Sequence, residues 1–145
     1  MMSQGTINFI TDPDYRWMSN FYSAPIMWCE GLHFPTVEHG FHYFKTNDVK
    51  WQTRILFAKT PGEAKRLGKL CPLREDWEDV KVTVMKELVT KKFEQHPDLT
   101  KKLLETGKRL IQEDAFWDSF WGIGRDGKGK NVMGKILSYI RRKGR

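Results

Sequence analysis

A long helical pattern that stops at Pro97 constrains the fold of this chain more than any other feature. From Trp77 onward, apolar residues recur at helical spacing, with Val80, Val84, Leu88 and neighbouring Met85 predicted to face inward, and proline cannot continue the helix. Caps and apolar spacing predict further helices over residues 37–47, 48–58, 61–68, 98–106 and 131–142. Short strands are predicted over residues 6–10, 24–28 and 109–113. The sequence therefore predicts an α+β fold, a compact and mostly helical domain with a few short strands.

The length and cysteine content point to one domain in a reducing compartment. The chain has 145 residues and no repeat, low-complexity stretch or linker, so residues 1–145 are expected to form a single domain. Cys29 and Cys71 are too few for a disulfide framework, which favours reduced thiols and a cytoplasmic location. No apolar run approaches the roughly 20 residues that a membrane helix needs, and the N-terminal residues lack a signal-peptide pattern. We therefore expect no membrane association.

The excess positive charge is confined to the C-terminal segment. Residues 125–145 hold eight Lys and Arg residues and one Asp, which accounts for the whole net charge of +7. A basic C-terminal helix favours a polyanionic partner, such as a phosphate, a pyrophosphate or a nucleic acid. The alternative is a solvated basic tail that only aids solubility. The sequence holds no helix-turn-helix or zinc-finger motif, which disfavours a plain nucleic-acid-binding module.

The predicted helix over residues 37–47 carries the first candidate for chemistry. Glu38, His42 and Lys45 are spaced at i, i+4 and i+7 and therefore share one face of this helix. Burial among aromatic residues would shift the pKa of both charged groups, so that Glu38 acts as an acid or base and Lys45 as an amine nucleophile. The alternative is a solvent-exposed Glu–Lys pair. His39 and His42 lack a third ligand at suitable spacing, so we expect structural histidines, no metal and no cofactor.

Aromatic and acidic residues are interleaved over residues 113–124, the second candidate region. Such a segment suits a pocket that stacks a planar base while an acid or base group lies near a sugar. Two carboxylates, here Glu38 and Asp118, are the usual equipment for cleaving a glycosidic bond. The alternative is an aromatic core with acidic residues on the surface.

A glycine-rich stretch that begins with Gly122 and Gly124 leads into Asn131, a predicted N-cap. A flexible loop that feeds a helix N-terminus is suited to bind phosphate. The pattern GxxxxGK occurs at residues 129–135, but Ile136 follows it where a P-loop needs Ser or Thr. A P-loop nucleotide hydrolase is therefore excluded.

Several blocks of the sequence resemble the NADAR family, in the same order along nearly the whole chain. They are WMSNFY (17–22), FPTVEH (34–39), AKTPGEAK (58–65), REDW (74–77), KF (92–93), LLETG (103–107), DSFWGIG (118–124) and GKNVMGK (129–135), together with Lys45. One departure lies on the Glu38 helix, where the family often has Glu-His-Ala-Phe-Gln and this chain has Gly40 and His42. Imidazole therefore replaces a polar contact that the Gln would make.

The resemblance implies a hydrolase that cleaves the N-glycosidic bond between a ribose and an exocyclic base nitrogen. One branch of the family resembles enzymes that remove ADP-ribose from guanine in DNA, and the basic segment favours ADP-ribosylated DNA as the substrate. Another branch resembles N-glycosidases of ribosylaminopyrimidine phosphates, ribosylamine phosphate intermediates of riboflavin biosynthesis. The alternative from another class is a non-catalytic module that binds ADP-ribose or NAD.

The expected site divides into catalytic and substrate-binding residues. The catalytic residues are Glu38, Lys45 and Asp118. The substrate-binding residues are Asn20 for sugar hydroxyls, Phe21, His42, Trp77 or Trp121 for stacking on a base, and Gly122, Gly124 and Asn131 for phosphates. In a direct route, one carboxylate protonates the departing nitrogen and the other activates water. In the favoured route, the sugar ring opens and Lys45 attacks C1 to form a Schiff base, while Glu38 shuttles protons.

Overall fold

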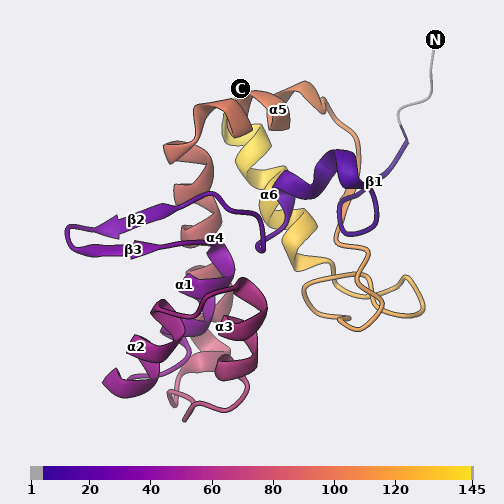
Figure 1. Cartoon of the computed structure of the whole chain (residues 1–145). Coiled ribbons are helices and arrows are strands. Elements are labelled where there is room, and N and C mark those ends of the chain that lie inside the picture. The colour runs from indigo at the N-terminus through magenta and orange to yellow at the C-terminus, as the bar shows by residue number, and fades with distance from the viewer. Residues whose placement is uncertain (1–4, 145) are drawn as a thin grey trace. The chain divides into compact units, whose positions relative to one another are not determined.

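The computed structural model of the chain describes residues 5–144, which form two compact units (Figure 1). One unit runs from Asn20 to His96. The other combines the N-terminal segment up to Ser19 with the residues from Pro97 onward. Among the described helices, none is both long enough and apolar enough to cross a membrane.

The unit from Asn20 to His96 combines a β-hairpin with a group of helices (Figure 1). Its elements are β2 (Ile26–Cys29), β3 (Leu32–Phe34), α1 (Val37–Phe44), α2 (Val49–Leu56), α3 (Pro61–Gly68) and α4 (Trp77–Gln95). Strands β2 and β3 pair antiparallel, and the turn between them uses Gly31 at φ +85°, which glycine adopts without strain. Helix α1 contacts α2, α3 and α4 and is therefore central to the unit.

Side-chain caps set the starts of three helices in this unit, and two of them, Thr36 and Thr60, follow the predicted cap pattern. Thr36 caps α1, Asp48 caps α2 and Thr60 caps α3, and each accepts a hydrogen bond from a backbone N–H of the first turn. Pro61 occupies the first position of α3, where its missing N–H costs no helical bond. These signals act within a few residues of the chain, and the predicted bounds of α3 and α4 are confirmed.

The core of this unit includes the apolar faces of α1 and α4. Phe41 of α1 is buried, as predicted, and so are Met85 and Leu88 of α4. Val84 was expected to face inward but is only half-buried, whereas Val89 is 1% exposed. The buried residues of α4 also include Trp77, Lys92 and Phe93, so its buried face is rotated about the helix relative to the predicted stripe.

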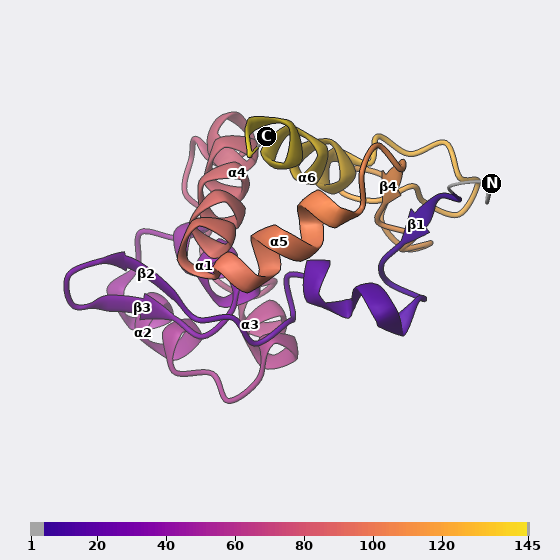
Figure 2. The same ribbon diagram turned by 90° about the horizontal axis from the view of Figure 1, so that it is seen from above.

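The unit formed by the two ends of the chain joins short strands to helices α5 and α6 (Figure 2). Its elements are β1 (Ile7–Asn8), a 3₁₀ helix (Pro13–Met18), α5 (Pro97–Glu105), β4 (Ile111–Gln112) and α6 (Val132–Lys143). Strands β1 and β4 pair in parallel, with Ile7 opposite Ile111. Gly107 lies just after α5 at φ +67°, a left-handed conformation that commonly ends a helix at glycine.

Two short elements were not predicted, the 3₁₀ helix and β3. Residues 12–14 were expected to mark a loop, and β3 covers only Leu32–Phe34. Elements of this length are too short to show a periodic apolar pattern, so they depend on their tertiary contacts. The observed elements, mostly helices with a few short strands, confirm the predicted α+β class.

Arg141 anchors α6 within the unit that contains both chain ends. Its side chain is buried, and Nη1 donates to Oγ1 of Thr106 at 2.9 Å while Nη2 donates to the carbonyl oxygen of Arg109 at 2.9 Å. One of the basic residues of the C-terminal segment is therefore structural. Its neighbours Arg142 and Lys143 are exposed and contribute positive charge to the surface of α6.

Candidate active site

Helix α1 presents Glu38, His42 and Lys45 on one face, as their spacing predicts. The Nε2 atom of His42 lies 2.8 Å from Oε2 of Glu38. Glu38 is 8% exposed and His42 is 4% exposed. The alternative of a solvent-exposed Glu–Lys pair is therefore wrong, because the carboxylate is buried and bonded to an imidazole on the same helix.

The N-terminal end of α1 is held by the loop that precedes β2. The backbone N–H of Glu38 donates to the carbonyl oxygen of Asn20 at 3.1 Å, which fixes the first turn of the helix. The side-chain amide of Asn20 lies 3.6 Å from the sulfur of Met85 on α4. Phe21, the next residue, is 44% exposed. Asn20 therefore helps to place Glu38 through its backbone, while its predicted contact with sugar hydroxyls stays a prediction.

Lys45 lies at the C-terminal end of α1 and is half-buried. Burial is the largest influence on its ammonium group and lowers its pKa from the ordinary value. The nearby Cys71 thiol and Glu38 carboxylate raise this pKa by less, and the charges of Lys69 and Lys65 lower it further. A larger fraction of Lys45 is therefore the free amine at a given pH, as a nucleophile requires.

Residues at the end of α3 complete the surroundings of this face, and sequence reasoning missed them. Lys65 and Lys69 are one helical turn apart, and their charges act on Lys45. Gly68 lies between them and packs so closely on His42 that a Cβ added there would be 2.1 Å from Nδ1. The available signal was the i, i+4 spacing of two lysines on the helix that follows α2.

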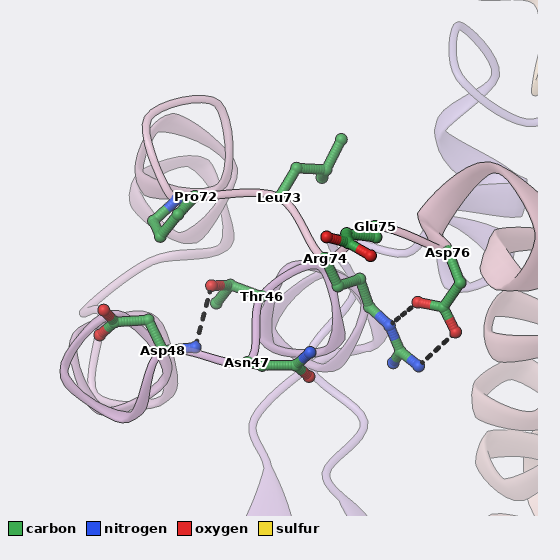
Figure 3. Close-up of a pocket in the computed structure, with 8 residues that line it drawn as sticks. All are labelled: Thr46, Asn47, Asp48, Pro72, Leu73, Arg74, Glu75 and Asp76. Carbon is green, nitrogen blue, oxygen red and sulfur yellow. Dashed lines mark hydrogen bonds and ion pairs between the residues drawn. The ribbon is translucent and has the colours of Figure 1, made fainter.

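A cavity of about 600 Å³ adjoins the end of α1, between the loop that follows α1 and the loop that follows α3 (Figure 3). The cavity is lined by Thr46, Asn47, Asp48, Pro72, Leu73, Arg74, Glu75 and Asp76. Figure 3 shows the guanidinium of Arg74 extended toward Asp76, with Nε and Nη2 at 2.6 and 3.0 Å from its carboxylate oxygens. This hydrogen-bonded pair lowers the pKa of Asp76. Its lining mixes polar side chains with Pro72 and Leu73, and it does not include Glu38, His42 or Lys45.

Trp77 has a different role from the predicted one. It was expected to stack on a base, but it is 4% exposed and its ring centroid lies 5.0 Å from that of Phe41. Trp77 begins α4 and is part of the core against α1. The predicted stacking role of Trp77 is therefore wrong, because its aromatic surface is covered by the protein.

Asp118 lies in the unit that contains both chain ends and holds a turn of its own loop. Its Oδ1 accepts hydrogen bonds from the backbone N–H groups of Phe120 and Trp121, at 3.0 and 2.9 Å. One carboxylate oxygen therefore orders the segment that carries Trp121. The pairing of Asp118 with Glu38 as two catalytic carboxylates stays a prediction, as does the stacking of Trp121 on a base.

The N-terminus of α6 does not offer the phosphate site that its glycine loop suggests. The backbone N–H groups of Val132 and Met133 donate to the carbonyl oxygens of Phe120 and Trp121, each at 3.1 Å. The segment that contains Gly122 and Gly124 therefore occupies the donors that a phosphate would need. The predicted binding of phosphate by the backbone N–H groups at this helix end is therefore wrong.

Asn131 precedes α6 at φ +51° and makes no capping hydrogen bond. Its side chain instead accepts from the N–H of Glu113 and donates to the carbonyl oxygen of Ile111, both at 2.9 Å. It therefore joins the start of α6 to strand β4. Substrate contacts at Gly122, Gly124 or Asn131 stay predictions and would have to use other atoms than these.

The two histidines of α1 are held by protein groups. His39 bonds through Nδ1 to Oγ1 of Thr36 at 2.8 Å and through Nε2 to the carbonyl oxygen of Ala58 at 3.0 Å, which confirms a structural role. Among residues 5–144, no three His, Cys, Asp or Glu side chains are grouped so that they could hold a metal ion. The α1 face itself carries a carboxylate, an imidazole and an amine.

Comparison with known proteins places this arrangement in a family. The NADAR domain model matches residues 8–145. The chain is 40% identical over 144 residues to the "N-glycosidase YbiA" of Escherichia coli, covering 97% of this chain and 89% of that protein. A "riboflavin biosynthesis protein" of Vibrio vulnificus is 35% identical over 143 residues, which cover 97% of this chain and 39% of that protein.

A solved structure shares the fold as well. The NMR structure of the E. coli protein YbiA superposes with a TM-score of 0.85 at 39% identity, covering 99% of this chain and 86% of that chain. Identity at this level over nearly the whole length sets the chain among the N-glycosyl hydrolases. The chain therefore belongs to the NADAR family.

Proposed function

We propose that this N-glycosyl hydrolase cleaves the bond between C1 of a phosphorylated ribose and the exocyclic nitrogen of a pyrimidine. The observation that carries the proposal is a half-buried lysine, Lys45, with a lowered pKa, on the same helix face as the buried carboxylate of Glu38. The pyrimidine substrate is supported by the relatives named as riboflavin biosynthesis proteins. The basic segment alone favours ADP-ribosylated DNA, so this proposal places the pyrimidine substrate ahead of it.

The proposed chemistry proceeds through a Schiff base on Lys45. The N-glycoside opens to an imine at C1, and the neutral Nζ of Lys45 adds to that carbon. The bond from C1 to the base nitrogen then breaks, and the base leaves as an amine with a proton delivered by Glu38. Water adds to the remaining iminium carbon, Glu38 takes up a proton, and the bond to Nζ breaks. The products are the free base, the ribose phosphate and the unmodified lysine.

A direct route uses Glu38 without a covalent intermediate. One carboxylate protonates the departing nitrogen while another activates water toward an oxocarbenium-like C1. Glu38 and Asp118 would be that pair. The lowered pKa of Lys45 favours the Schiff-base route, since a direct displacement has no use for a neutral amine at this position.

Positive charge near Lys45 supports a phosphorylated sugar. Lys65 and Lys69 belong to the end of α3, and their charges lower the pKa of Lys45. A phosphate held by these lysines would keep the sugar within reach of the amine and offset their mutual repulsion. We assign phosphate binding to Lys65 and Lys69 in place of the glycine loop before α6.

A second candidate substrate is ADP-ribose attached to guanine in DNA. The observation that favours it is the concentration of the whole net charge of +7 in residues 125–145, of which Arg142 and Lys143 are exposed. Such a surface would bind a DNA backbone in a strongly salt-dependent manner. A small pyrimidine substrate needs no such surface.

The deciding experiment compares base release from a ribosylaminopyrimidine phosphate and from ADP-ribosyl-guanine DNA. We expect faster release from the pyrimidine substrate by the wild type, and loss of release in Lys45→Ala and Lys45→Arg. Borohydride should trap the ribose on the wild-type protein and not on either variant. Full activity in either variant would exclude the Schiff base. Tight binding of ADP-ribose in a calorimeter, with no release from either substrate, would instead identify a non-catalytic module.

A further inference from the structure

His42 is buried between a carboxylate and a glycine. Its side chain is 5% exposed, and Nε2 lies 2.8 Å from Oε2 of Glu38, one helical turn earlier on α1. The other ring nitrogen, Nδ1, is buried and has no hydrogen-bond partner among the described residues. The two ring nitrogens therefore differ, since Nε2 is bonded to Glu38 and Nδ1 is not hydrogen-bonded.

Gly68 covers the unbonded nitrogen. A Cβ at position 68 would lie 2.1 Å from Nδ1, 2.6 Å from Cγ and 2.9 Å from Cβ of His42. These distances mean that the backbone of α3 touches the imidazole directly and that only glycine permits this approach. The fit holds the ring in one orientation, with Nε2 turned toward Glu38.

These surroundings select one tautomer of the neutral ring. With the proton on Nδ1, an N–H donor would be buried without an acceptor, which costs about 1–3 kcal/mol. In that tautomer the lone pair of Nε2 would also face the carboxylate oxygen. With the proton on Nε2, the ring donates to Glu38 and leaves only an acceptor lone pair against Gly68.

The charged form of the ring is disfavoured by its surroundings. Burial is the largest influence and lowers the pKa of His42. Glu38 raises this pKa, whereas the charges of Lys45 on α1 and Lys65 on α3 lower it. Near neutral pH the ring is therefore a neutral donor.

We propose that His42 is a positioning residue for Glu38, whose Oε2 it holds through Nε2–H so that Oε1 performs the proton transfers at C1. This rests on the proposed function for its chemical consequence. A carboxylate bonded through one oxygen cannot rotate freely, so its other oxygen keeps a fixed direction relative to Lys45. Misplacing a catalytic group by about 1 Å can reduce turnover by about 10²-fold, which sets the scale of the expected effect.

The first test is independent of activity. Histidine ¹⁵N spectra of the full chain at pH 7, with the His42 signal assigned through its loss in His42→Gln, report which ring nitrogen carries the proton. We expect a protonated Nε2 and an unprotonated Nδ1. A ring protonated on Nδ1, or on both nitrogens, would overturn the proposal. If the wild type hydrolyses neither substrate, the proposed function fails, and this spectrum still decides whether His42 donates to Glu38.

The second test separates positioning from packing. His42→Gln retains an N–H donor on the same helix face and should keep kcat within about threefold of the wild type. His42→Leu removes the donor and should lower kcat by tenfold or more, with KM changed by less than about threefold. Melting curves accompany each variant, and His42→Phe, which keeps a ring, replaces the leucine variant if that one does not fold. Equal kcat values for the donor and non-donor variants would overturn the proposal.

Discussion

The backbone N–H of Arg74 donates a 2.8 Å hydrogen bond to the carbonyl oxygen of Lys45. This bond joins the C-terminal end of α1 to the loop that follows α3, and the guanidinium of Arg74 also donates to the carbonyl oxygen of Phe44 at 3.4 Å. Lys45, which carries the proposed nucleophile, is therefore held in place by a loop that is distant from it in sequence. Lys65 and Lys69, the lysines that lower the pKa of Lys45, lie in α3 and at its C-cap, just before this loop.

The pH dependence of turnover should follow Lys45. Burial lowers its pKa, and the amine must be neutral to attack, so kcat should rise with pH and level off below the pH of an ordinary lysine. Removing the charge of Lys69 should raise the pKa of Lys45, so Lys69→Met should move this rise to higher pH. The shift should shrink with added salt, because Lys69 is exposed. Lys50→Met, on the exposed surface of α2, is the control and should leave the profile unchanged.

Glu38→Gln should lower kcat by about 10²-fold, the scale typical of general acid–base catalysis. The amide retains a carbonyl oxygen that can accept from His42, so folding should change little. Calorimetry with a substrate analogue should show binding near the wild-type level. A variant that binds the analogue and turns over substrate at the wild-type rate would remove Glu38 from the mechanism.

Two substitutions at Asp118 separate its charge from its structural bonds. Asn keeps the Oδ1 acceptor for the N–H groups of Phe120 and Trp121, whereas Ala removes it. If Asp118 acts as the second carboxylate, we expect Asp118→Asn to lower kcat by about tenfold or more without a change in melting temperature. Asp118→Ala should in addition lose about 1 kcal/mol of unfolding free energy. Wild-type turnover in Asp118→Asn would leave this residue only its role in the loop.

Because of Lys92, the free energy of unfolding should increase as the pH rises from 7 toward 10. It lies on α4, is 1% exposed, and burial lowers its pKa to about 7. Between this pKa and the ordinary value of 10.5, the unfolded chain binds the extra proton, so the unfolding free energy rises with pH. The contribution of one such group is at most about 1.4 kcal/mol per pH unit.

The measurement is urea unfolding of the wild type and Lys92→Met between pH 7 and 10. The variant should be the more stable protein at pH 7 and should show a flatter dependence on pH. Lys101→Met, at an exposed position of α5, should keep the wild-type slope. Parallel slopes for the wild type and Lys92→Met would contradict the assignment.

Gly68→Ala should destabilise the unit from Asn20 to His96, because the added methyl group would meet the ring of His42 at 2.1 Å. Overpacking of this kind typically costs about 1–3 kcal/mol. Gly62 in the same helix is the matched control, since a Cβ there would meet only Oγ1 of Thr60 at 3.9 Å. Gly62→Ala should be neutral or gain up to about 1 kcal/mol, the helix preference of alanine over glycine. Denaturant midpoints of the two variants should therefore move in opposite directions or differ clearly in size.

Much of the helical framework could be predicted because its signals are local. Thr36, Asp48 and Thr60 accept hydrogen bonds from N–H groups only two or three positions ahead, so these bonds depend on residues within one helical turn. The shared face of Glu38, His42 and Lys45 follows from the same helical geometry. In contrast, β3 and the 3₁₀ helix carry too few residues for a pattern and were missed.

The roles of individual site residues depended on packing between distant segments. The indole of Trp77 was expected in a ligand pocket and is buried against Phe41, which lies 36 positions earlier by the numbering of the chain. The N–H groups at the start of α6 were expected to bind phosphate and instead donate to the loop before them. An aromatic ring or a helix end has the same sequence signature in either setting, because its partner is chosen by the fold.

The sequence by itself determined where most helices begin, that Glu38 and Lys45 lie on one helix face, and which family the chain belongs to. The tertiary structure alone decided that the Glu38–His42 pair is buried, that Gly68 covers the far side of that ring, and that α3 supplies the charges near Lys45. The physical reason is one of range. Capping and periodicity act over one or two helical turns, whereas burial and pKa are set by groups that the fold brings together from far apart in the chain.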